Sequence, residues 1–344
     1  MRTVLAYTLL CLAIDLSAQT RLFDDEAKIA AWMKEANVPA AGVGIIRDGK
    51  LTQVEVYGHL QQGERAPYDT LFNVASLTKP VVTMLTLKLV ADGKWQLDEP
   101  LARDWVDPDV AADPRHLKLT TRHVLNHTTG FKNWRFMEES EKLTFHADPG
   151  TTMQYSGEGF EYLRRALERR FKKTLPELAQ SLIFDPLKMH DTQFAWDART
   201  DESRFARWHD GEGKHAYPEH RKTTVNAADD LITTVEDYGR FAAWVLSGAG
   251  LPPALFQEMT KDQSGVKENF AMGLGWELHR NVGGETVLIH GGADRGVAAV
   301  VMLLPKSKQG LIVMTNADNG YRLYEKLVTE LLDAGSELMS RARK

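Results

Sequence analysis

LFNVASLTKP at residues 71–80, followed by the apolar run VVTMLTLKLV at residues 81–90, is the stretch that decides the fold. Ser76 and Lys79 are three residues apart, so on a helix they share one face and the lysine can reach the serine hydroxyl. A serine hydroxyl is a weak nucleophile until a neighbouring base takes its proton, and a lysine can do so once burial lowers its pKa. Pro80 has no N–H and is tolerated only near a helix start. The stretch therefore predicts a loop that delivers Ser76 to the start of a buried helix, whose first N–H groups favour developing negative charge.

A second Ser-x-x-Lys match occurs at Ser264 and Lys267. It lies in a polar run that is typical of a solvated surface, whereas Ser76 is flanked on both sides by apolar residues. Context therefore favours Ser76. Spacing and context alone leave two interpretations of Ser76 open, a nucleophile or an ordinary helix N-cap.

The composition is that of an ordinary globular protein. Of 344 residues, 43% are hydrophobic and 26% are charged, which allows one large domain or two intergrown ones. The formal net charge is -5 and no stretch interleaves basic with aromatic residues, so nucleic acid is not expected as a partner. Cys11 is the only cysteine, so a mature chain without the N-terminal segment would have no disulfide, thiolate catalyst or cysteine-bound metal.

The N-terminus has the features of a secretory signal. A charged start precedes an apolar run at residues 4–14, and Leu-Ser-Ala at residues 16–18 forms a suitable cleavage site. We therefore expect residues 1–18 to be a signal peptide and the protein to be exported, either periplasmic or extracellular. Asp15 leaves a competing interpretation open, a membrane-anchoring or merely apolar N-terminus. No later run reaches 18 apolar residues, so no further membrane span is expected.

The hydrophobic patterns predict an α+β fold. Helices are expected at residues 23–36, 76–92, 121–125, 233–248 and 324–338, with two longer helices over residues 158–182. Strands are expected at residues 41–47, 51–57, 275–278, 286–290, 296–304 and 310–315, the first two joined by an Asp-Gly turn. We expect the first hairpin to pair with the last strands, giving one antiparallel sheet built from both chain ends and flanked by helices.

A long insertion separates the two ends of this sheet. The α/β part is expected over about residues 22–93 and 222–344, with a mainly helical insertion over about residues 94–221. Residues 208–220 are expected to form an exposed loop. A site is expected between the sheet and the insertion.

Two further short elements carry chemistry. Tyr155 precedes Ser156-Gly157 and a predicted helix, and a tyrosine phenol can act as a base only where nearby cations stabilise the phenolate. His-Gly-Gly-Ala at residues 290–293 ends a predicted strand, where a missing side chain lets substrate approach the backbone. Taken alone, the competing interpretations are a core or capping aromatic at Tyr155 and an ordinary strand-to-turn signal at His290.

Motifs of other site classes are not found in the sequence. His123 and His127 are four residues apart but lack the glutamate of His-Glu-x-x-His, so no metal is expected there. Surface positions are expected for His209, His215 and His220, because the carboxylates near them are not arranged in a pattern that dictates a metal site. The sequence contains neither a Gly-x-Ser-x-Gly elbow nor a phosphate-binding glycine fingerprint, which disfavours an α/β-hydrolase, and no cofactor is expected.

In chain order, Ser76-Leu77-Thr78-Lys79, Tyr155-Ser156-Gly157 and His290-Gly291-Gly292 resemble the motifs of the serine β-lactamase and penicillin-binding-protein superfamily. The similarity is greatest to the class C β-lactamase-like branch, which includes D,D-carboxypeptidases, D-aminopeptidases and esterases. Supporting matches lie at residues 93–100, 125–130, 185–189, 231–238 and 273–276. The resemblance implies a β-lactamase/transpeptidase-like fold in a single catalytic domain over residues 19–344.

The resemblance also implies roles for individual residues. Ser76 would be the acylated nucleophile, with Lys79 beside it to hold or relay its proton. Tyr155 would act as base and later protonate the leaving group. His290 stands where many relatives have the lysine of Lys-Thr-Gly. The backbone N–H groups of Ser76 and Ala293 would form the oxyanion hole, and the acyl-enzyme would then be hydrolysed.

Gly157 departs from the family pattern, which has asparagine at this position. That asparagine normally contacts the lysine and the substrate amide, so its absence weakens the case for β-lactam or peptide hydrolysis and favours an ester or an unusual amide. Gly157 and Gly292 are still expected to line the substrate-binding site.

Two functions follow from the sequence. The first is a secreted serine hydrolase that acts through an acyl-enzyme on a small-molecule ester, peptide or β-lactam. The alternative is a non-catalytic binding or scaffolding protein that keeps the penicillin-recognising fold. Intact Ser76, Lys79 and Tyr155 favour the enzyme. The substrate and the oligomeric state stay open.

Overall fold

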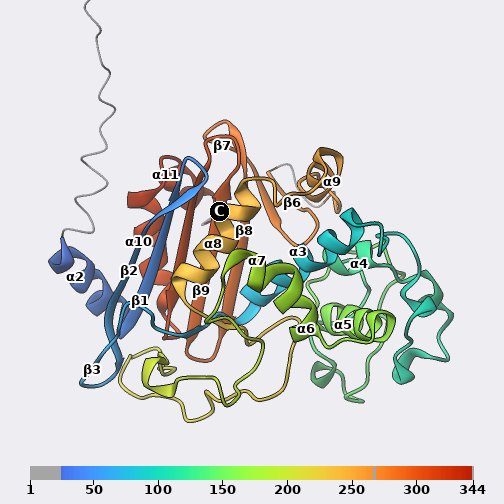
Figure 1. The fold of residues 1–344 in the computed structure, drawn as a ribbon, viewed down its shortest axis with the longest axis horizontal. Helices are drawn as coiled ribbons and strands as arrows, with labels where there is room; N and C mark the ends of the chain where they lie inside the picture. The colour runs from blue at the N-terminus through green and yellow to red at the C-terminus, as the bar shows by residue number, and fades with distance from the viewer. Residues whose placement is uncertain (1–24, 266–268, 343–344) are drawn as a thin grey trace, which may run out of the picture.

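The computed structural model describes residues 25–265 and 269–342. The expected signal segment and Lys267 of the second Ser-x-x-Lys match lie outside these ranges. Within them, one sheet has the strand order β3-β2-β1-β10-β9-β8-β7-β6 (Figure 1). Its strands are β1 (Ala40–Arg47), β2 (Lys50–Gln61), β3 (Glu64–Arg65), β6 (Phe270–Met272), β7 (Glu277–Val282), β8 (Glu285–Asp294), β9 (Val297–Leu304) and β10 (Gln309–Thr315).

The sheet joins the two ends of the chain, as the sequence predicted. β1 pairs antiparallel with β10, with Val43 opposite Val313, and with β2 on its other side. β1 and β9 are apolar along nearly their whole length and buried on both faces, which is why they take central positions. A second, small sheet pairs β4 (Phe72–Asn73) with β5 (Ile232–Thr233) just before the Ser76 turn.

Helices cover both faces of the sheet and form the insertion (Figure 1). The α-helices are α2 (Glu26–Ala36), α3 (Thr78–Ala91), α4 (Thr121–Leu125), α5 (Gly157–Phe171), α6 (Leu175–Ala179), α7 (Asp185–Leu187), α8 (Val235–Leu246), α9 (Pro253–Met259), α10 (Gly320–Leu331) and α11 (Gly335–Ala342). The short 3-10 turns are η1 (Ala75–Leu77), η2 (Leu101–Arg103), η3 (Pro108–Val110), η4 (Pro114–Lys118), η5 (Arg135–Met137) and η7 (Glu202–Arg204), and η6 (Gln180–Phe184) is a π-turn.

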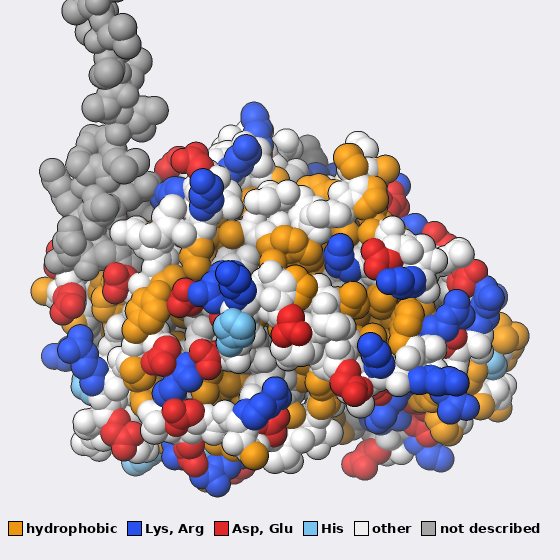
Figure 2. Space-filling model, in the orientation of Figure 1, with side chains coloured by type: hydrophobic (Ala, Val, Ile, Leu, Met, Phe, Trp, Pro, Cys, Tyr) orange, Lys and Arg blue, Asp and Glu red, His pale blue; other side chains and the backbone are white. Residues whose placement is uncertain are grey.

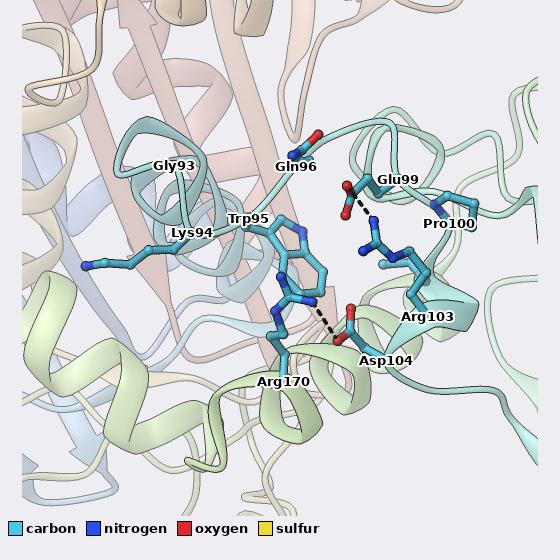
Figure 3. Close-up of a pocket in the computed structure, with 10 residues that line it drawn as sticks. Gly93, Lys94, Trp95, Gln96, Glu99, Pro100, Arg103, Asp104 and Arg170 are labelled. Atoms are coloured by element: carbon cyan, nitrogen blue, oxygen red, sulfur yellow. Dashed lines mark hydrogen bonds and ion pairs between the residues drawn. The ribbon is translucent and has the colours of Figure 1, made fainter.

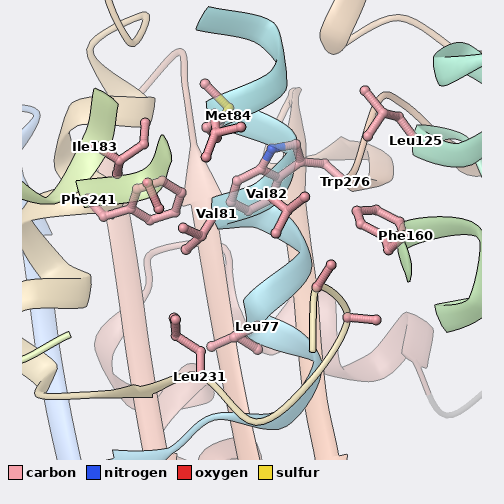
Figure 4. Close-up of a cluster of buried hydrophobic side chains, with 14 of the residues drawn as sticks. Leu77, Val81, Val82, Met84, Leu125, Phe160, Ile183, Leu231, Phe241 and Trp276 are labelled. Carbon is pink, nitrogen blue, oxygen red and sulfur yellow. The ribbon is translucent and has the colours of Figure 1, made fainter. Parts of the chain in front are cut away.

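Helix α3 lies at the junction of the sheet and the helical insertion (Figure 4). It is apolar on nearly all sides, and a helix of that kind is stable only when it is surrounded. Phe160 of α5 packs on it from the insertion, Phe241 of α8 from the sheet side, and Trp276 from the segment before β7. This packing fixes the turn that precedes α3 relative to both parts of the chain.

The second face of the sheet packs against α2, α10 and α11. The sequence predicted one closing helix at residues 324–338, whereas the structure has two, α10 and α11. The chain turns at Leu332–Ala334 and returns so closely that a Cβ at Gly335 would lie 1.9 Å from the Val328 carbonyl oxygen. Only glycine permits that approach.

The expected exposed loop at residues 208–220 is partly buried, which corrects the prediction. Trp208, His209 and His220 are at most 4% exposed. Trp208 packs with Leu71 and Ala75 beside the turn that carries Ser76, and the His209 backbone N–H donates to the Asn316 carbonyl. His209 and His220 are therefore core residues, contrary to the expected surface positions.

The surface in Figure 2 interleaves Lys and Arg with Asp and Glu, with no large area of one sign on that face. Among the described residues, none of the helices has the length and apolar content needed to cross a bilayer.

Candidate active site

The turn that carries Ser76 is held from both sides. Ala75, directly before it, has φ +45°, a left-handed conformation that is strained for a residue with a side chain. The Asn73 carboxamide fixes this turn, because its Oδ1 accepts from the Ala75 N–H at 2.8 Å and its Nδ2 donates to Asp230 at 3.1 Å. Ser76 is partly exposed while its neighbours at 71–75 and 77–80 are buried, so it is the residue of this turn that solvent reaches.

Lys79 lies beneath this hydroxyl. Its ammonium nitrogen Nζ donates to Ser76 Oγ at 2.9 Å and to the Ala228 carbonyl at 2.8 Å, and the side chain is fully buried. Burial lowers the pKa of Lys79 to about 7, against the opposing charge of Asp229. A substantial fraction of Lys79 is therefore neutral near pH 7 and able to accept a proton.

Tyr155 meets the same two residues. Its phenol contacts the Ser76 side chain, and Lys79 Nζ lies 4.6 Å from the centre of its ring. Burial raises the pKa of Tyr155 above its ordinary value, more than the Ser76 contact lowers it. The phenol is therefore protonated at neutral pH. Tyr155 lies just before α5 in the chain. The N-cap of this helix is Ser156, whose Oγ accepts from the Gly159 N–H at 3.1 Å.

His127 supports Tyr155 from behind, a contact that the sequence did not reveal. The two rings stack with centroids 4.3 Å apart, and His127 Nδ1 accepts from the Ser156 N–H at 3.1 Å. Burial, followed by the charge of Lys79, lowers the pKa of His127 well below its ordinary value. His127 is thus a neutral side chain that packs on Tyr155. The four-residue spacing between His123 and His127 in the sequence does not indicate this role.

The His290 segment lies beside the nucleophile turn as part of β8, which continues to Asp294. Burial lowers the pKa of His290 to about 4, so the imidazole is neutral at pH 7. A Cβ at Gly292 would lie 2.2 Å from the Val74 carbonyl oxygen. Glycine is required there for β8 to pass this close to the turn.

Ala293 has its backbone directed toward the open edge of β8. Pairing with β7 ends at Ile289, so beyond that residue β8 has a strand neighbour only in β9 among the described residues. Ala293 is opposite Ala298, whose carbonyl accepts from Thr315 Oγ1 on the β10 side. Ala293 and Ala298 therefore form a pair whose N–H groups face away from each other, and the Ala293 N–H faces the edge next to η1.

Gly157 is buried against a tryptophan. A Cβ at this position would lie 2.5 Å from the indole of Trp134, which occupies the space that a larger side chain would need. The aromatic residues of the loop at 131–136 were visible in the sequence, but their approach to Gly157 was not.

Three carboxylates gather near Lys79. One oxygen each of Asp229, Asp230 and Asp294 lies within 4.8 Å of the others, a spacing that a hard cation could occupy. Burial raises the pKa of Asp229 to about 7, with the neighbouring Asp230 adding to the effect. These residues are far apart from Lys79 in sequence, and no motif identified them. Their effect on the site is electrostatic, since the Asp229 charge raises the pKa of Lys79.

A separate pocket of about 220 Å³ lies in the insertion (Figure 3). Trp95 forms its wall, and ion pairs join Arg103 to Glu99 at 2.5 Å and Arg170 to Asp104 at 3.3 Å. Ser76, Lys79 and Tyr155 do not line it. The pocket is therefore not part of the candidate active site.

Known proteins resemble this chain along most of its length. Residues 26–335 match the family model described as Beta-lactamase. Protein flp of Staphylococcus aureus is 21% identical over 330 residues, covering 88% of this chain and 64% of that protein, so the chain spans less than two thirds of that relative. Esterase EstB of Burkholderia gladioli is 26% identical over 306 residues, covering 71% of this chain and 75% of that protein.

Two solved structures have a similar fold. An octameric penicillin-binding protein homologue from Pyrococcus abyssi superimposes with a TM-score of 0.77 at 20% identity, covering 90% of this chain and 77% of that one. A D-stereospecific amidohydrolase from Streptomyces sp. gives a TM-score of 0.68 at 23% identity, covering 88% of this chain and 98% of that one. These likenesses confirm the fold expected from the sequence.

Proposed function

The chain belongs to the beta-lactamase family, and from that premise we propose that it is a serine hydrolase that cleaves carboxylic esters through an acyl-enzyme on Ser76. The observation that carries the proposal is the 2.9 Å contact between Lys79 Nζ and a partly exposed Ser76 hydroxyl, with Lys79 at a pKa of about 7. A nucleophile and a base in hydrogen-bonding contact are the minimum that acyl transfer needs.

Lys79 is the better base of the two candidates. The resemblance assigns that role to Tyr155, but burial keeps the Tyr155 phenol protonated, whereas part of Lys79 is neutral. In the proposed first step, the Ser76 proton passes to Lys79 Nζ while Oγ bonds to the ester carbonyl carbon. The carbonyl oxygen becomes an oxyanion facing the N–H groups of Ser76 and Ala293.

The tetrahedral intermediate then breaks its bond to the alkoxy oxygen. Tyr155 donates its phenolic proton to the departing alkoxide and receives a proton back from the Lys79 ammonium, so that the alcohol leaves and the acyl group stays on Ser76. In the second half, water attacks the acyl carbon and passes a proton to Lys79 Nζ. The bond between the acyl carbon and Ser76 Oγ then breaks, Oγ takes the proton back from Lys79, and the carboxylic acid leaves.

Charge at the site disfavours a substrate that carries a carboxylate. β-Lactams and D-alanyl peptides carry a carboxylate near the bond that is cleaved. The position that many relatives fill with a lysine is His290, which is neutral at pH 7, and Asp229 and Asp294 would repel a carboxylate. Gly157 cannot offer the amide that the family pattern supplies. An ester without a carboxylate fits these features better than a β-lactam.

The relatives support a hydrolase of esters or amides. One is named an esterase and another is titled a D-stereospecific amidohydrolase. A D-amino-acid amide, which carries an ammonium group and no carboxylate, is the second candidate substrate, favoured by the acidic residues beside Lys79.

The test compares p-nitrophenyl acetate, a D-amino-acid amide and nitrocefin on purified protein and on Ser76→Ala. We expect acetate hydrolysis to be the fastest and to fall by about 10⁴-fold or more in Ser76→Ala, because the variant has no nucleophile. Ser264→Ala is the matched control and should stay active. A binding or scaffolding protein, the alternative, would hydrolyse none of the three.

We also propose that residues 1–18 are a signal peptide and that the mature enzyme is exported, as the charged start and apolar run suggest. N-terminal sequencing of protein recovered outside the cytoplasm should begin near Gln19. Recovery of the full chain from the cytoplasm would contradict export.

A further inference from the structure

We propose that Trp134, held against Gly157, is a specificity-determining residue that receives an apolar group of the ester substrate. The inference rests on the proposed function and deepens it, because it states which part of the ester the site selects.

The indole of Trp134 fills the space beside the Tyr155 element. Three of its ring carbons, Cη2, Cζ2 and Cζ3, would lie 2.5 to 2.8 Å from a Cβ at Gly157. Real Cβ atoms do not approach other atoms this closely, so a side chain at 157 and the indole in this position exclude each other. With glycine at 157, the space that the asparagine of the family pattern would occupy is therefore filled by the aromatic ring of Trp134, which comes from another loop.

The loop that carries Trp134 is fastened on both sides of the indole. Before it, the N–H of Gly157 donates to the Asn133 carbonyl at 3.0 Å and to Asn133 Oδ1 at 2.8 Å. After it, the N–H of Arg135 donates to Glu158 Oε1 at 2.9 Å, and the Arg135 guanidinium pairs with Glu158 at 2.8 Å and Asp107 at 3.0 Å. An aromatic side chain held in this way costs little conformational entropy when a ligand packs on it.

Trp134 is partly exposed and continues into an apolar surface. Phe136 stacks beside it with ring centroids 6.3 Å apart and an interplanar angle of 14°, and Phe136 is 67% exposed. The next residue, Met137, is 53% exposed. Grouped apolar side chains at a surface are a feature of interaction sites, ligand-binding grooves among them.

A cavity of about 630 Å³ adjoins this surface, and more than half of the residues that line it are charged. Trp134 lines it together with Trp105, Tyr162 and Asn226. Asn226 stands two residues before Ala228, whose carbonyl accepts from Lys79. The cavity thus extends from the Trp134 loop toward the segment that contacts Lys79, although Ser76, Lys79 and Tyr155 do not line it. The indole itself lies beside the site through its contact with Gly157, two residues after Tyr155.

The apolar area that an alkyl chain would bury on this surface sets the expected preference for long-chain over short-chain esters. Covering about 55 Å² of apolar area is worth roughly a tenfold preference at 25 cal/mol per Å². Chain-length preference should therefore depend on the indole, and the chain could belong to either the acyl or the alkoxy part of the ester.

The experiment measures kcat/KM for two pairs of substrates, p-nitrophenyl octanoate against p-nitrophenyl acetate and octyl acetate against ethyl acetate. We expect the wild type to prefer the long chain in at least one pair, and Trp134→Ala to reduce that preference about tenfold. The first pair identifies an acyl site and the second an alkoxy site. Trp32→Ala, which removes a partly buried indole from α2, is the matched control and should keep the wild-type ratio.

Gly157→Asn supplies an independent check. Alone it should lower the melting temperature by several degrees because the side chain meets the indole, and combined with Trp134→Ala it should recover part of that loss. Thermal unfolding by circular dichroism measures both.

Results of two kinds, in substrate preference or in stability, would overturn the assignment. One is a wild-type enzyme that hydrolyses the acetate esters with no chain-length preference, or a Trp134→Ala variant whose preference is unchanged. The other is a Gly157→Asn variant as stable as the wild type. A wild type that hydrolyses none of the esters would contradict the proposed function itself. That outcome differs from an active enzyme whose kcat/KM ratio between long-chain and short-chain esters does not depend on Trp134, which would contradict only the present inference.

Discussion

At the scale of single residues, the site depends on what burial does to two side chains that share the Ser76 hydroxyl. Lys79 and Tyr155 are both buried, and burial disfavours the charged form of each. The same physical effect makes lysine a better base and tyrosine a worse one. The assignment of Lys79 as base follows from this difference.

The first prediction concerns pH. Because the proposed base is neutral Lys79, kcat/KM should rise with pH through a midpoint near 7, where Lys79 loses its proton. Asp229→Asn removes the charge that raises the pKa of Lys79, so the midpoint should move to lower pH. Initial rates on p-nitrophenyl acetate between pH 5 and pH 9 measure both profiles.

Asp48→Asn is the control, because it also removes one carboxylate but does so at the tip of the first hairpin. Its kcat/KM should rise with pH through the same midpoint as in the wild type. A midpoint that stays in place or rises in Asp229→Asn would contradict the coupling to Lys79.

The second prediction concerns His127, whose pKa lies well below its ordinary 6.5 in the folded protein. Below pH 6.5 the unfolded chain binds a proton at His127 that the folded chain does not, so this contribution to stability is full above pH 6.5 and is lost as pH falls. His127→Asn keeps an acceptor for the Ser156 N–H and suits the positive φ of this position.

The free-energy cost of His127→Asn should therefore be smaller at pH 5 than at pH 7. Urea unfolding of both proteins at the two pH values measures it. An equal cost at both would show that His127 is not held neutral.

At the scale of elements, the proposed catalysis requires β8 to pass close to the turn η1. Gly292→Ala would place a methyl group 2.2 Å from the Val74 carbonyl oxygen and push the strand away from Ser76. A displacement of this kind should lower kcat/KM about a hundredfold while β8 stays paired with β9.

Gly291→Ala is the control for this change, since a Cβ there has nothing within 4 Å. Activity on p-nitrophenyl acetate, with circular dichroism to check folding, separates the two variants. Equal losses would mean that the close approach of Gly292 has no catalytic importance.

Much of the element pattern was predictable, because strands and helices with a buried face have strong periodicity. The first hairpin, α4, α8 and β8 to β10 were all expected close to their observed positions. The failures have local causes. The break between α10 and α11 arises from a tertiary approach at Gly335, and the burial of Trp208 arises from packing against Leu71, which is distant in sequence.

The parts of the site that were predictable are those whose residues lie close together in the sequence. Ser76 and Lys79 share one turn, so their spacing alone predicted that they could meet. Asp229, His127 and Trp134 reach the site through tertiary packing, and no spacing in the sequence encodes such contacts. Gly157 was noted as a departure, but the indole that explains it lies 23 residues earlier in the chain.

At the scale of the whole molecule, the two ends of the chain close one sheet around α3. β1 pairs with β10 across almost the entire sequence, and one buried cluster includes Phe160 of the insertion and Trp276 of the sheet part. We therefore predict that sheet and insertion unfold together, so that esterase activity and far-UV ellipticity share one midpoint in urea. Activity lost at a lower concentration, with ellipticity intact, would show that the insertion unfolds independently.

The central claim is that Ser76 is the residue that becomes acylated, and intact-protein mass spectrometry with a fluorophosphonate tests it most directly. We expect one adduct per chain, located on Ser76 after proteolysis, with a labelling rate that rises with pH through about 7 as Lys79 loses its proton. An adduct on another residue, or equal labelling of Ser76→Ala, would contradict the account.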